Sequence, residues 1–167
     1  MARKSLLQGE IRQRRPFQST AHEAVLALIR TTDLVHRRLA AVIEPHGLTT
    51  QQFNVLRILR GADEEGLPTL VIRDRMIHEA PGITRLLDKL EKAGLARRER
   101  TSPDRRQVFC FITERGRAML DELDGEMKEA DEVAVGNLSD AEQRQLLKLL
   151  EGVRAGHRTK TVEPQSA

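Results

Sequence analysis

The stretch from Pro68 to Thr113 constrains the fold of this chain most, because two helical patterns are followed there by two strand patterns. In the second helical pattern, apolar residues recur at the i, i+3, i+4 and i+7 positions of one buried face: Ile83, Leu86, Leu87 and Leu90. The opposite face carries polar and charged groups: Thr84, Arg85, Asp88, Lys89 and Lys92. Such a helix suits the major groove of DNA, although an ordinary solvated helix face has the same pattern.

A short helix before this one decides between the two interpretations. Its apolar side consists of Leu70 or Val71 together with Ile72 and Met76. A corner of about four residues then leads into the second helix, which is the arrangement of a helix-turn-helix motif. We therefore interpret the polar face of the second helix as facing DNA.

The start of the second helix is suited to an anion. Pro81 fits the first helical position, because its φ is already helical and its missing N–H would have had no partner there. Ala80 is a poor N-cap, so the N–H groups of the first turn are left for a phosphate. Gly82 adds no side chain where a backbone would have to approach DNA.

A two-stranded wing is predicted after Gly94, which suits a helix C-cap. Residues 102–104 read Ser-Pro-Asp, which is turn chemistry, between strand patterns at residues 95–100 and 107–113. In the second strand, Cys110 falls on the inward face, where core packing is favoured over a redox role, and Phe109 and Phe111 fall on the outer face. Four arginines lie near the tip of this wing: Arg98, Arg100, Arg105 and Arg106.

Charge is distributed unevenly along the 167 residues, although the net charge is only +3. Residues 1–17 and residues 68–115 each carry a net +4, whereas residues 116–151 carry −6. This uneven charge distribution is expected if one basic surface of the protein binds a polyanion. A chain of this length fits one domain or one protomer of a dimer. One cysteine, no membrane-length apolar run and no signal-peptide core lead us to expect a cytoplasmic protein.

Two helices are predicted before the helix-turn-helix. The first runs from Thr20 to Ile43, with Thr20 and Glu23 as a capping box. The second starts at Thr49 or Thr50, with Thr49 and Gln52 able to cap each other. Its apolar stripe is Phe53, Leu56 and Leu59. Residues 61–68 are expected to form a loop.

Two more helices are predicted after the wing. Thr113 caps the first, which runs to about Val133, and Ser139 with Glu142 caps the second. The first long helix and these last two carry more apolar surface than a winged helix alone could cover. A two-fold dimer is the economical solution, and a monomer whose helices fold back is the alternative.

From Leu48 to Leu120 the chain resembles winged-helix regulators of the MarR family, and flanking segments extend the resemblance to roughly Thr20–Val153. The matching segments are LTTQQFNVLRIL, PGITRLLDKLEKAGLARRER, DRR and FITERGRAML. Asp104 and Arg106 match the family's Asp-x-Arg wing signature. Ile112, Thr113 and Gly116 match its Leu-Thr-x-x-Gly helix start. Two departures fall in the first helix of the motif: Arg73 is expected to disturb helix packing, and Ile77 to prolong the helix into the corner.

The resemblance implies a mainly α fold with a small two-stranded β wing, formed by a winged helix-turn-helix DNA-binding lobe and a helical dimerisation region. It implies a dimeric regulator, expected to be a repressor, that binds a pseudo-palindromic operator in double-stranded DNA. The expected segments are a basic flexible arm (1–17), a dimerisation helix (18–47), the DNA-binding domain (48–115), two dimerisation helices (116–155) and a disordered tail (156–167). Whether the arm contacts DNA or only aids solubility stays open.

The DNA contacts follow from the same resemblance. Thr84, Arg85 and Lys89 are expected in the major groove and Arg106 in the flanking minor groove, with Asp104 holding Arg106 in place. The complete set of expected DNA-binding residues is Gly82, Thr84, Arg85, Lys89, Arg98, Arg100, Asp104, Arg105 and Arg106.

A small aromatic or anionic effector is a further implication of the resemblance, with an equally plausible alternative that the same residues belong to core and surface. The expected lining residues are His36, Leu39, Phe53, Arg57 and Met119. The five histidines show no ligand spacing, so no metal site and no cofactor are expected.

Two other function classes remain for comparison. A winged-helix module that binds protein instead of DNA would bind its partner with little salt dependence. A small helical enzyme would need a phosphate loop, a nucleophile elbow or paired carboxylates, and the sequence offers none of these.

Overall fold

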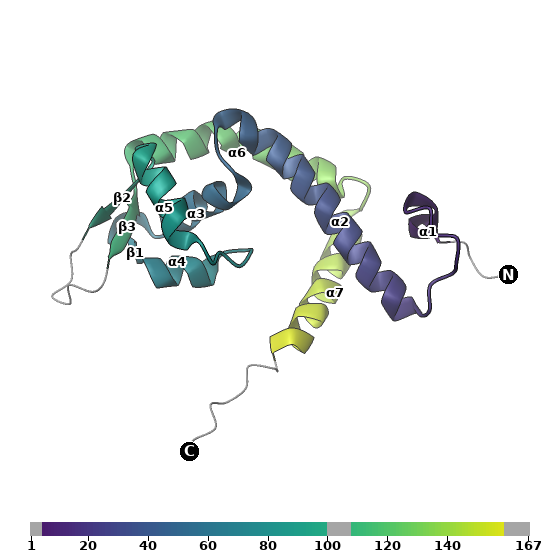
Figure 1. Cartoon of the computed structure of the whole chain (residues 1–167). Helices are drawn as coiled ribbons and strands as arrows, with labels where there is room; N and C mark the ends of the chain where they lie inside the picture. The colour runs from purple at the N-terminus through teal and green to yellow at the C-terminus, as the bar shows by residue number, and fades with distance from the viewer. Residues whose placement is uncertain (1–4, 100–107, 159–167) are drawn as a thin grey trace, which may run out of the picture. The chain divides into compact units, whose positions relative to one another are not determined.

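The computed structural model describes residues 5–99 and 108–158, which form seven α-helices, two 3₁₀ turns and three short strands (Figure 1). The chain divides into two compact units, Met1–Ala130 and Asp131–Ala167. The α-helices are α1 Leu6–Glu10, α2 Thr20–Ile43, α3 Thr50–Arg60, α4 Thr69–Arg75, α5 Ile83–Lys92, α6 Glu114–Val135 and α7 Asp140–Arg158. The strands are β1 Leu67–Pro68, β2 Ala96–Glu99 and β3 Phe109–Ile112, and the 3₁₀ turns are Glu44–His46 and Asp63–Glu65.

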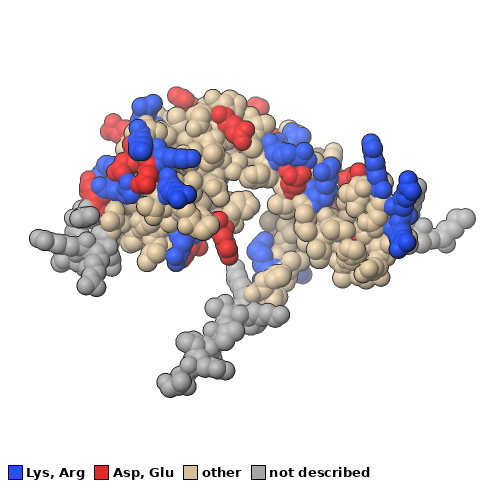
Figure 2. Space-filling view, viewed as in Figure 1, with Lys and Arg blue, Asp and Glu red and all other residues tan. Residues whose placement is uncertain are grey.

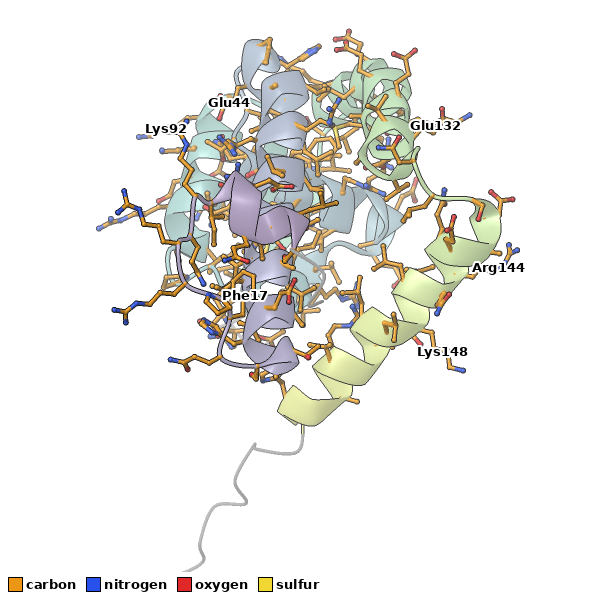
Figure 3. All side chains as sticks on the ribbon, turned by 90° about the vertical axis from the view of Figure 1, so that its right-hand side faces the viewer. Phe17, Glu44, Lys92, Glu132, Arg144 and Lys148 are labelled. Carbon is orange, nitrogen blue, oxygen red and sulfur yellow. The ribbon has the colours of Figure 1, made fainter. Side chains whose placement is uncertain are left out.

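Within the segment expected to be a flexible arm (1–17), residues Leu6–Glu10 form the short helix α1. Ser5 caps α1 by accepting a hydrogen bond from the Gln8 N–H, and Leu7 is only 9% exposed. In the loop before α2, the Phe17 ring meets the His22 ring edge-on at 5.8 Å (Figure 3). Burial of one leucine and a capped turn explain why this polar stretch is helical.

Helices α2 and α3 begin where local capping directs them. The prediction of Thr20–Ile43 is confirmed for α2, but the capping residue is Ser19 and not Thr20. Ser19 is extended and its Oγ accepts from the His22 N–H at 3.1 Å, whereas Thr20 is already helical. The reciprocal cap of Thr49 and Gln52 is confirmed, with distances of 2.9 and 3.2 Å.

The first helix of the motif ends earlier than Ile77 suggested. α4 stops at Arg75, and Met76 is extended with a ψ of 140°. The Ile77 N–H donates to Oδ1 of Asn54 on α3 at 2.9 Å, which replaces a further helical bond. Arg73 points outward and pairs with Asp74, so it does not disturb the packing.

The corner between α4 and α5 is seven residues long, Met76 to Gly82, instead of about four. Pro81 therefore lies in a turn before the helix and not at its first position. The Ile83 N–H closes this turn by donating to the Ala80 carbonyl at 3.1 Å. Gly82 is the N-cap of α5.

The wing strands belong to a three-stranded antiparallel sheet of order β1-β3-β2, not to an isolated hairpin. The additional strand β1 pairs Leu67 with Cys110, in a segment that we expected to be a loop. On β2, Arg98 pairs with the other side of Cys110. Two residues are too few to show the alternation by which a strand is predicted. The predicted fold class, mainly α with a small β wing, is confirmed.

Phe111 is buried, which corrects its assignment to an outer wing face. Its side chain is 8% exposed, and the Arg97 guanidinium lies 4.3 Å from the ring centroid. A Cβ on Gly66, whose φ is +62°, would stand 2.4 Å from the Phe111 ring. The loop before β1 thus covers the face that the sequence pattern left open.

Aliphatic side chains from α3, α4, α5, α6 and the sheet form one core. Its fully buried members include Val55, Leu56, Leu59, Ile72, Leu87, Leu90, Cys110, Leu120 and Leu123. The sequence left open whether Leu70 or Val71 belongs to the apolar side of α4. Leu70 is 61% exposed, whereas Val71 packs against the core. This core fixes α5 against α3 and the sheet, with its polar face outward.

The two C-terminal helices start at the predicted caps. Thr113 Oγ1 accepts from the Gly116 N–H at 3.1 Å, and Ser139 and Glu142 cap α7 reciprocally. α7 continues through Arg158, three residues into the predicted tail, and residues 159–167 lie outside the described range. Among the described residues, no helix has the length and apolar character needed to cross a membrane.

Candidate nucleic-acid interface

Helix α5 separates buried apolar residues from exposed polar ones. Ile83, Leu87 and Leu90 are at most 7% exposed. Thr84, Arg85 and Lys89 are all exposed on the other side. Figure 2 shows basic and acidic side chains interspersed over the region where Figure 1 places α5 and the sheet. The groups suited to phosphates and base edges are therefore available on the surface.

The N-terminus of α5 is open. In the described part of the chain, no side chain caps it, and Gly82 has the N-cap position. A Cβ built on Gly82 meets no atom within 4 Å, so the space on that side of the backbone is open. The Ile83 N–H already donates to the Ala80 carbonyl, but the N–H groups of Thr84 and Arg85 also lie at the positive end of the helix dipole and can donate to an anion.

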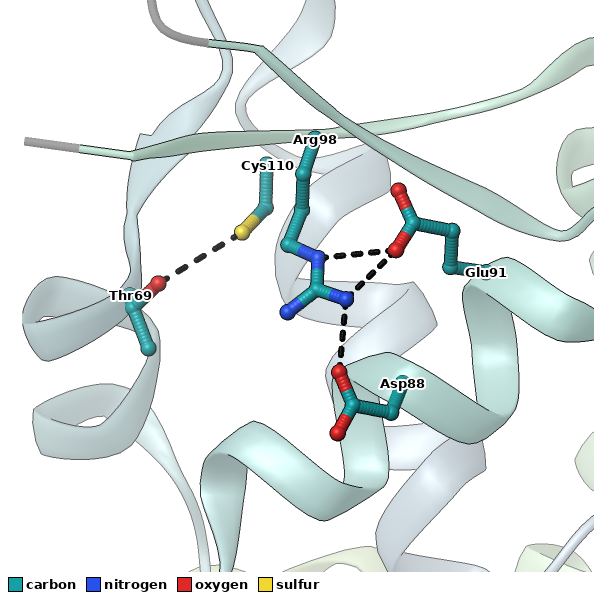
Figure 4. Close-up of polar contacts among 5 residues, drawn as sticks. All are labelled: Thr69, Asp88, Glu91, Arg98 and Cys110. Atoms are coloured by element: carbon teal, nitrogen blue, oxygen red, sulfur yellow. Dashed lines mark hydrogen bonds and ion pairs between the residues drawn. The ribbon is translucent and has the colours of Figure 1, made fainter.

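Arg98, one of the residues predicted to contact DNA, is held by two carboxylates of α5. Its Nη2 donates to Asp88 Oδ1 at 2.6 Å and to Glu91 Oε2 at 2.5 Å, and its Nε donates to Glu91 at 2.9 Å (Figure 4). The hydrogen bond with Glu91 raises the pKa of Arg98. Arg98 thus joins β2 to α5 and neutralises two acidic groups of that helix.

The remaining predicted wing residues, Arg100, Asp104, Arg105 and Arg106, lie outside the described residues. Their assignment to DNA contacts stays a prediction from the sequence. In the described part of the wing, Arg97 stacks on Phe111 and also forms an ion pair with Glu99.

Of the five predicted effector residues, His36 lines a groove in the part of the chain that the structure describes. A groove of about 450 Å³ lies between α2, the start of α3 and the corner before α5. His36 lies in it, and its ring meets that of His78 at 5.6 Å. The complete lining is Ile29, Thr32, Asp33, His36, Thr49, Thr50, Gln51 and His78.

The other four predicted effector residues lie elsewhere. Phe53 is in the core at 5% exposure, and Leu39 and Met119 pack against that core. Arg57 is exposed and lies 5.9 Å from the Phe53 ring centroid. A role for these four residues in binding an effector stays a prediction from the sequence.

Cys110 is a core residue, as the alternation in β3 predicted. Its side chain is fully buried and its Sγ lies 3.7 Å from Thr69 Oγ1 (Figure 4). Burial raises the pKa of the Cys110 thiol, which disfavours the reactive thiolate. Within residues 5–99 and 108–158, no three His, Cys, Asp or Glu side chains group as metal ligands.

Comparison with known proteins agrees with this geometry. The sequence model of the MarR family matches residues 46–107. A solved MarR transcription factor from Planctomyces limnophilus is 37% identical, with a TM-score of 0.64, over 81% of this chain and 98% of that chain. The transcriptional regulator TtmR of Methylorubrum extorquens is 34% identical over 64% of this chain, but the match spans only 54% of TtmR. The homoprotocatechuate degradative operon repressor of Escherichia coli is 25% identical over 75% of this chain and 84% of its own length.

Proposed function

Because the chain belongs to the MarR family of DNA-binding transcriptional regulators, we propose that it is a repressor that binds a pseudo-palindromic operator as a dimer. These relatives are transcriptional regulators and not enzymes. The observation that carries the proposal is the division of α5 into a buried apolar face and an exposed face with Thr84, Arg85 and Lys89.

In this proposal α5 is the recognition helix. Arg85 and Thr84 read base edges near the open N-terminus, and Lys89 contacts a phosphate one turn further along. The Gly82 backbone approaches the DNA backbone. Arg106 at the wing enters the flanking minor groove, where a narrow groove concentrates negative potential, and Asp104 holds it.

Exposed apolar side chains support the proposed dimer. On α2, Val25, Ile29 and Leu34 are 45–61% exposed. On α7, Leu147, Leu149 and Val153 are 47–61% exposed, and no described α7 side chain is buried. A partner chain that covers these faces gains roughly 25 cal/mol per Å² of apolar surface. A two-fold dimer then places two α5 helices about 34 Å apart for successive major grooves.

The repressor role is supported by the E. coli relative, which is named a repressor. A small aromatic or anionic effector that relieves repression would bind in the groove around His36, where Thr32, Thr50 and His78 supply polar groups and Ile29 an apolar one. Of the residues expected from the sequence to bind an effector, His36 lines this groove.

Selection of bound fragments from random duplex DNA tests the function directly. We expect enrichment of an inverted repeat whose half-sites are about one helical turn apart, with an affinity that falls steeply as salt increases. Light scattering on the free protein should give twice the mass of one chain. Failure to retard any duplex in dilute buffer, together with salt-insensitive binding to a protein partner, would favour the protein-interaction module instead.

A further inference from the structure

His36 on α2 and His78 in the corner before α5 form a contact that the DNA-facing surface does not use. Their ring centroids lie 5.6 Å apart and the ring planes meet at 86°, an edge-to-face arrangement. Both side chains are exposed, and both line the groove described above. The contact joins the longest helix of the first unit to the segment that leads into α5.

A second contact holds the same corner. The neighbouring residue, Ile77, donates its N–H to Oδ1 of Asn54 on α3 at 2.9 Å. The corner is therefore attached to α3 by a hydrogen bond and to α2 by a ring pair. Because the corner determines where α5 begins, both contacts position the recognition helix.

The two contacts respond differently to protons. The Asn54 amide does not titrate, whereas imidazoles as a class change charge between about pH 5 and pH 8. One protonated ring is compatible with an edge-to-face pair, since a cation is attracted to a π face. With both rings protonated, two like charges face each other, which destabilises the contact.

Two carboxylates lie near the pair, Asp33 in the groove and Glu79 in the corner. Asp33 lines the same groove, but its Oδ2 is already paired with Arg37 at 2.8 Å and Arg30 at 3.6 Å. Glu79 follows His78 in the corner and is exposed. From α3 the groove receives Thr49, Thr50 and Gln51, which are uncharged and lie at the positive end of that helix.

We propose that the His36–His78 contact is a proton-sensitive attachment of the corner, and that double protonation loosens the start of α5 and weakens DNA binding. This inference rests on the proposed function. His36, His78 and Asn54 are positioning residues in it, because they act on DNA through α5.

The test measures the dissociation constant for the duplex recovered by selection, between about pH 8 and pH 5.5 at constant ionic strength. From the higher to the lower pH, wild type should lose about three- to tenfold in affinity relative to both His36→Gln and His78→Gln. Taking this ratio removes the effect of the other groups that titrate in this range. The one extra positive charge that wild type gains would by itself tighten binding to DNA, so it opposes the expected loss. Asn54→Ala loosens the same corner without a titrating group, so it should bind less tightly at every pH and keep the wild-type profile. His22→Gln, which changes the imidazole packed on Phe17, should also follow wild type.

A measurement without DNA tests the corner itself. The hydrogen-exchange protection factor of the Ile77 amide should fall on acidification in wild type and stay constant in His78→Gln. Parallel binding profiles of wild type and both glutamine variants would overturn the proposal and leave the proposed function intact. A constant Ile77 protection factor in wild type would overturn it as well. Absence of duplex binding at any pH would instead refute the proposed function.

Discussion

Arg60 on α3 and Asp124 on α6 form a two-pronged ion pair, with Nη1 and Nη2 each 2.9 Å from a carboxylate oxygen. The partners are separated by 64 positions in the sequence. The hydrogen bond from Arg60 lowers the pKa of Asp124, and the same bond raises the pKa of Arg60. This pair ties the helix that packs beneath the recognition helix to the start of the C-terminal region.

Asp124→Asn should lower the free energy of unfolding by about 0.5–1 kcal/mol at pH 7, a modest loss because the carboxylate is 51% exposed. Because the pKa of Asp124 is lowered in the folded state, the ion pair stabilises the fold fully at pH values above 3.8, the ordinary pKa of an aspartate. This stabilisation is lost as the pH falls through the folded-state pKa. Urea denaturation at several pH values measures the free energy of unfolding and its dependence on pH. Asp121→Asn is the matched control, because Asp121 meets Arg60 through one longer contact of 3.3 Å. An equal loss of stability in both variants would contradict the conclusion that Asp124 is the stronger partner of Arg60.

Arg98→Gln should weaken DNA binding without lowering the salt dependence of the dissociation constant. The guanidinium is bound to Asp88 and Glu91, so its loss leaves two acidic groups unneutralised on α5. A lost phosphate contact would instead reduce the slope of log K against log salt by about 0.9. Combining Arg98→Gln with Asp88→Asn and Glu91→Gln should restore most of the affinity, since the unpaired carboxylates are then removed.

Arg85→Ala should relax base preference at one position of each half-site and cost about 1–3 kcal/mol of binding free energy. Repeated selection with the variant measures the preference. Lys89→Ala is the control, because a phosphate contact weakens binding to all sequences alike. An unchanged preference in Arg85→Ala would show that this side chain touches only the DNA backbone.

Arg106→Ala should weaken binding by about 1–3 kcal/mol and lower the salt slope by about one unit, whatever the sequence. Titrations of one duplex at several salt concentrations measure the slope. If Asp104 holds Arg106 in place, Asp104→Ala should weaken DNA binding and lower the salt slope as Arg106→Ala does, but by less. No loss in Arg106→Ala would remove the wing from the interface.

Gly116→Ala should destabilise the fold by about 1–3 kcal/mol. A Cβ there would stand 2.2 Å from the Leu95 carbonyl oxygen, which is backbone and cannot rotate away. Gly125→Ala on the same helix meets no atom within 4 Å and should stabilise by up to about 1 kcal/mol through helix propensity. Thermal unfolding of the two variants should therefore shift in opposite directions.

Local interactions explain what the sequence predicted well. Helix ends depend on residues within one or two helical turns. This holds for the limits of α2 and for the caps formed by Thr49 with Gln52, by Thr113, and by Ser139 with Glu142. The face of α5 that is exposed also follows from periodicity, because 3.6 residues per turn put Arg85 opposite Leu87 and Leu90 and leave Thr84 at the edge of the apolar face. The exposed polar face of α5 could thus be predicted before the fold was known.

Contacts between distant segments were decided only by the tertiary structure. The two residues of β1 form a strand because β3 lies beside them, and Phe111 is buried because the loop at Gly66 crosses its ring. Arg98 was predicted to meet DNA, yet the sheet brings it to Asp88 and Glu91, and charge alone could not show which anion it would bind. The sequence by itself determined the helices, their polar and apolar faces and the family, since these depend on short-range patterns. Which charges remain available for DNA depends on how the chain folds back on itself, and that is why only the packed structure shows it.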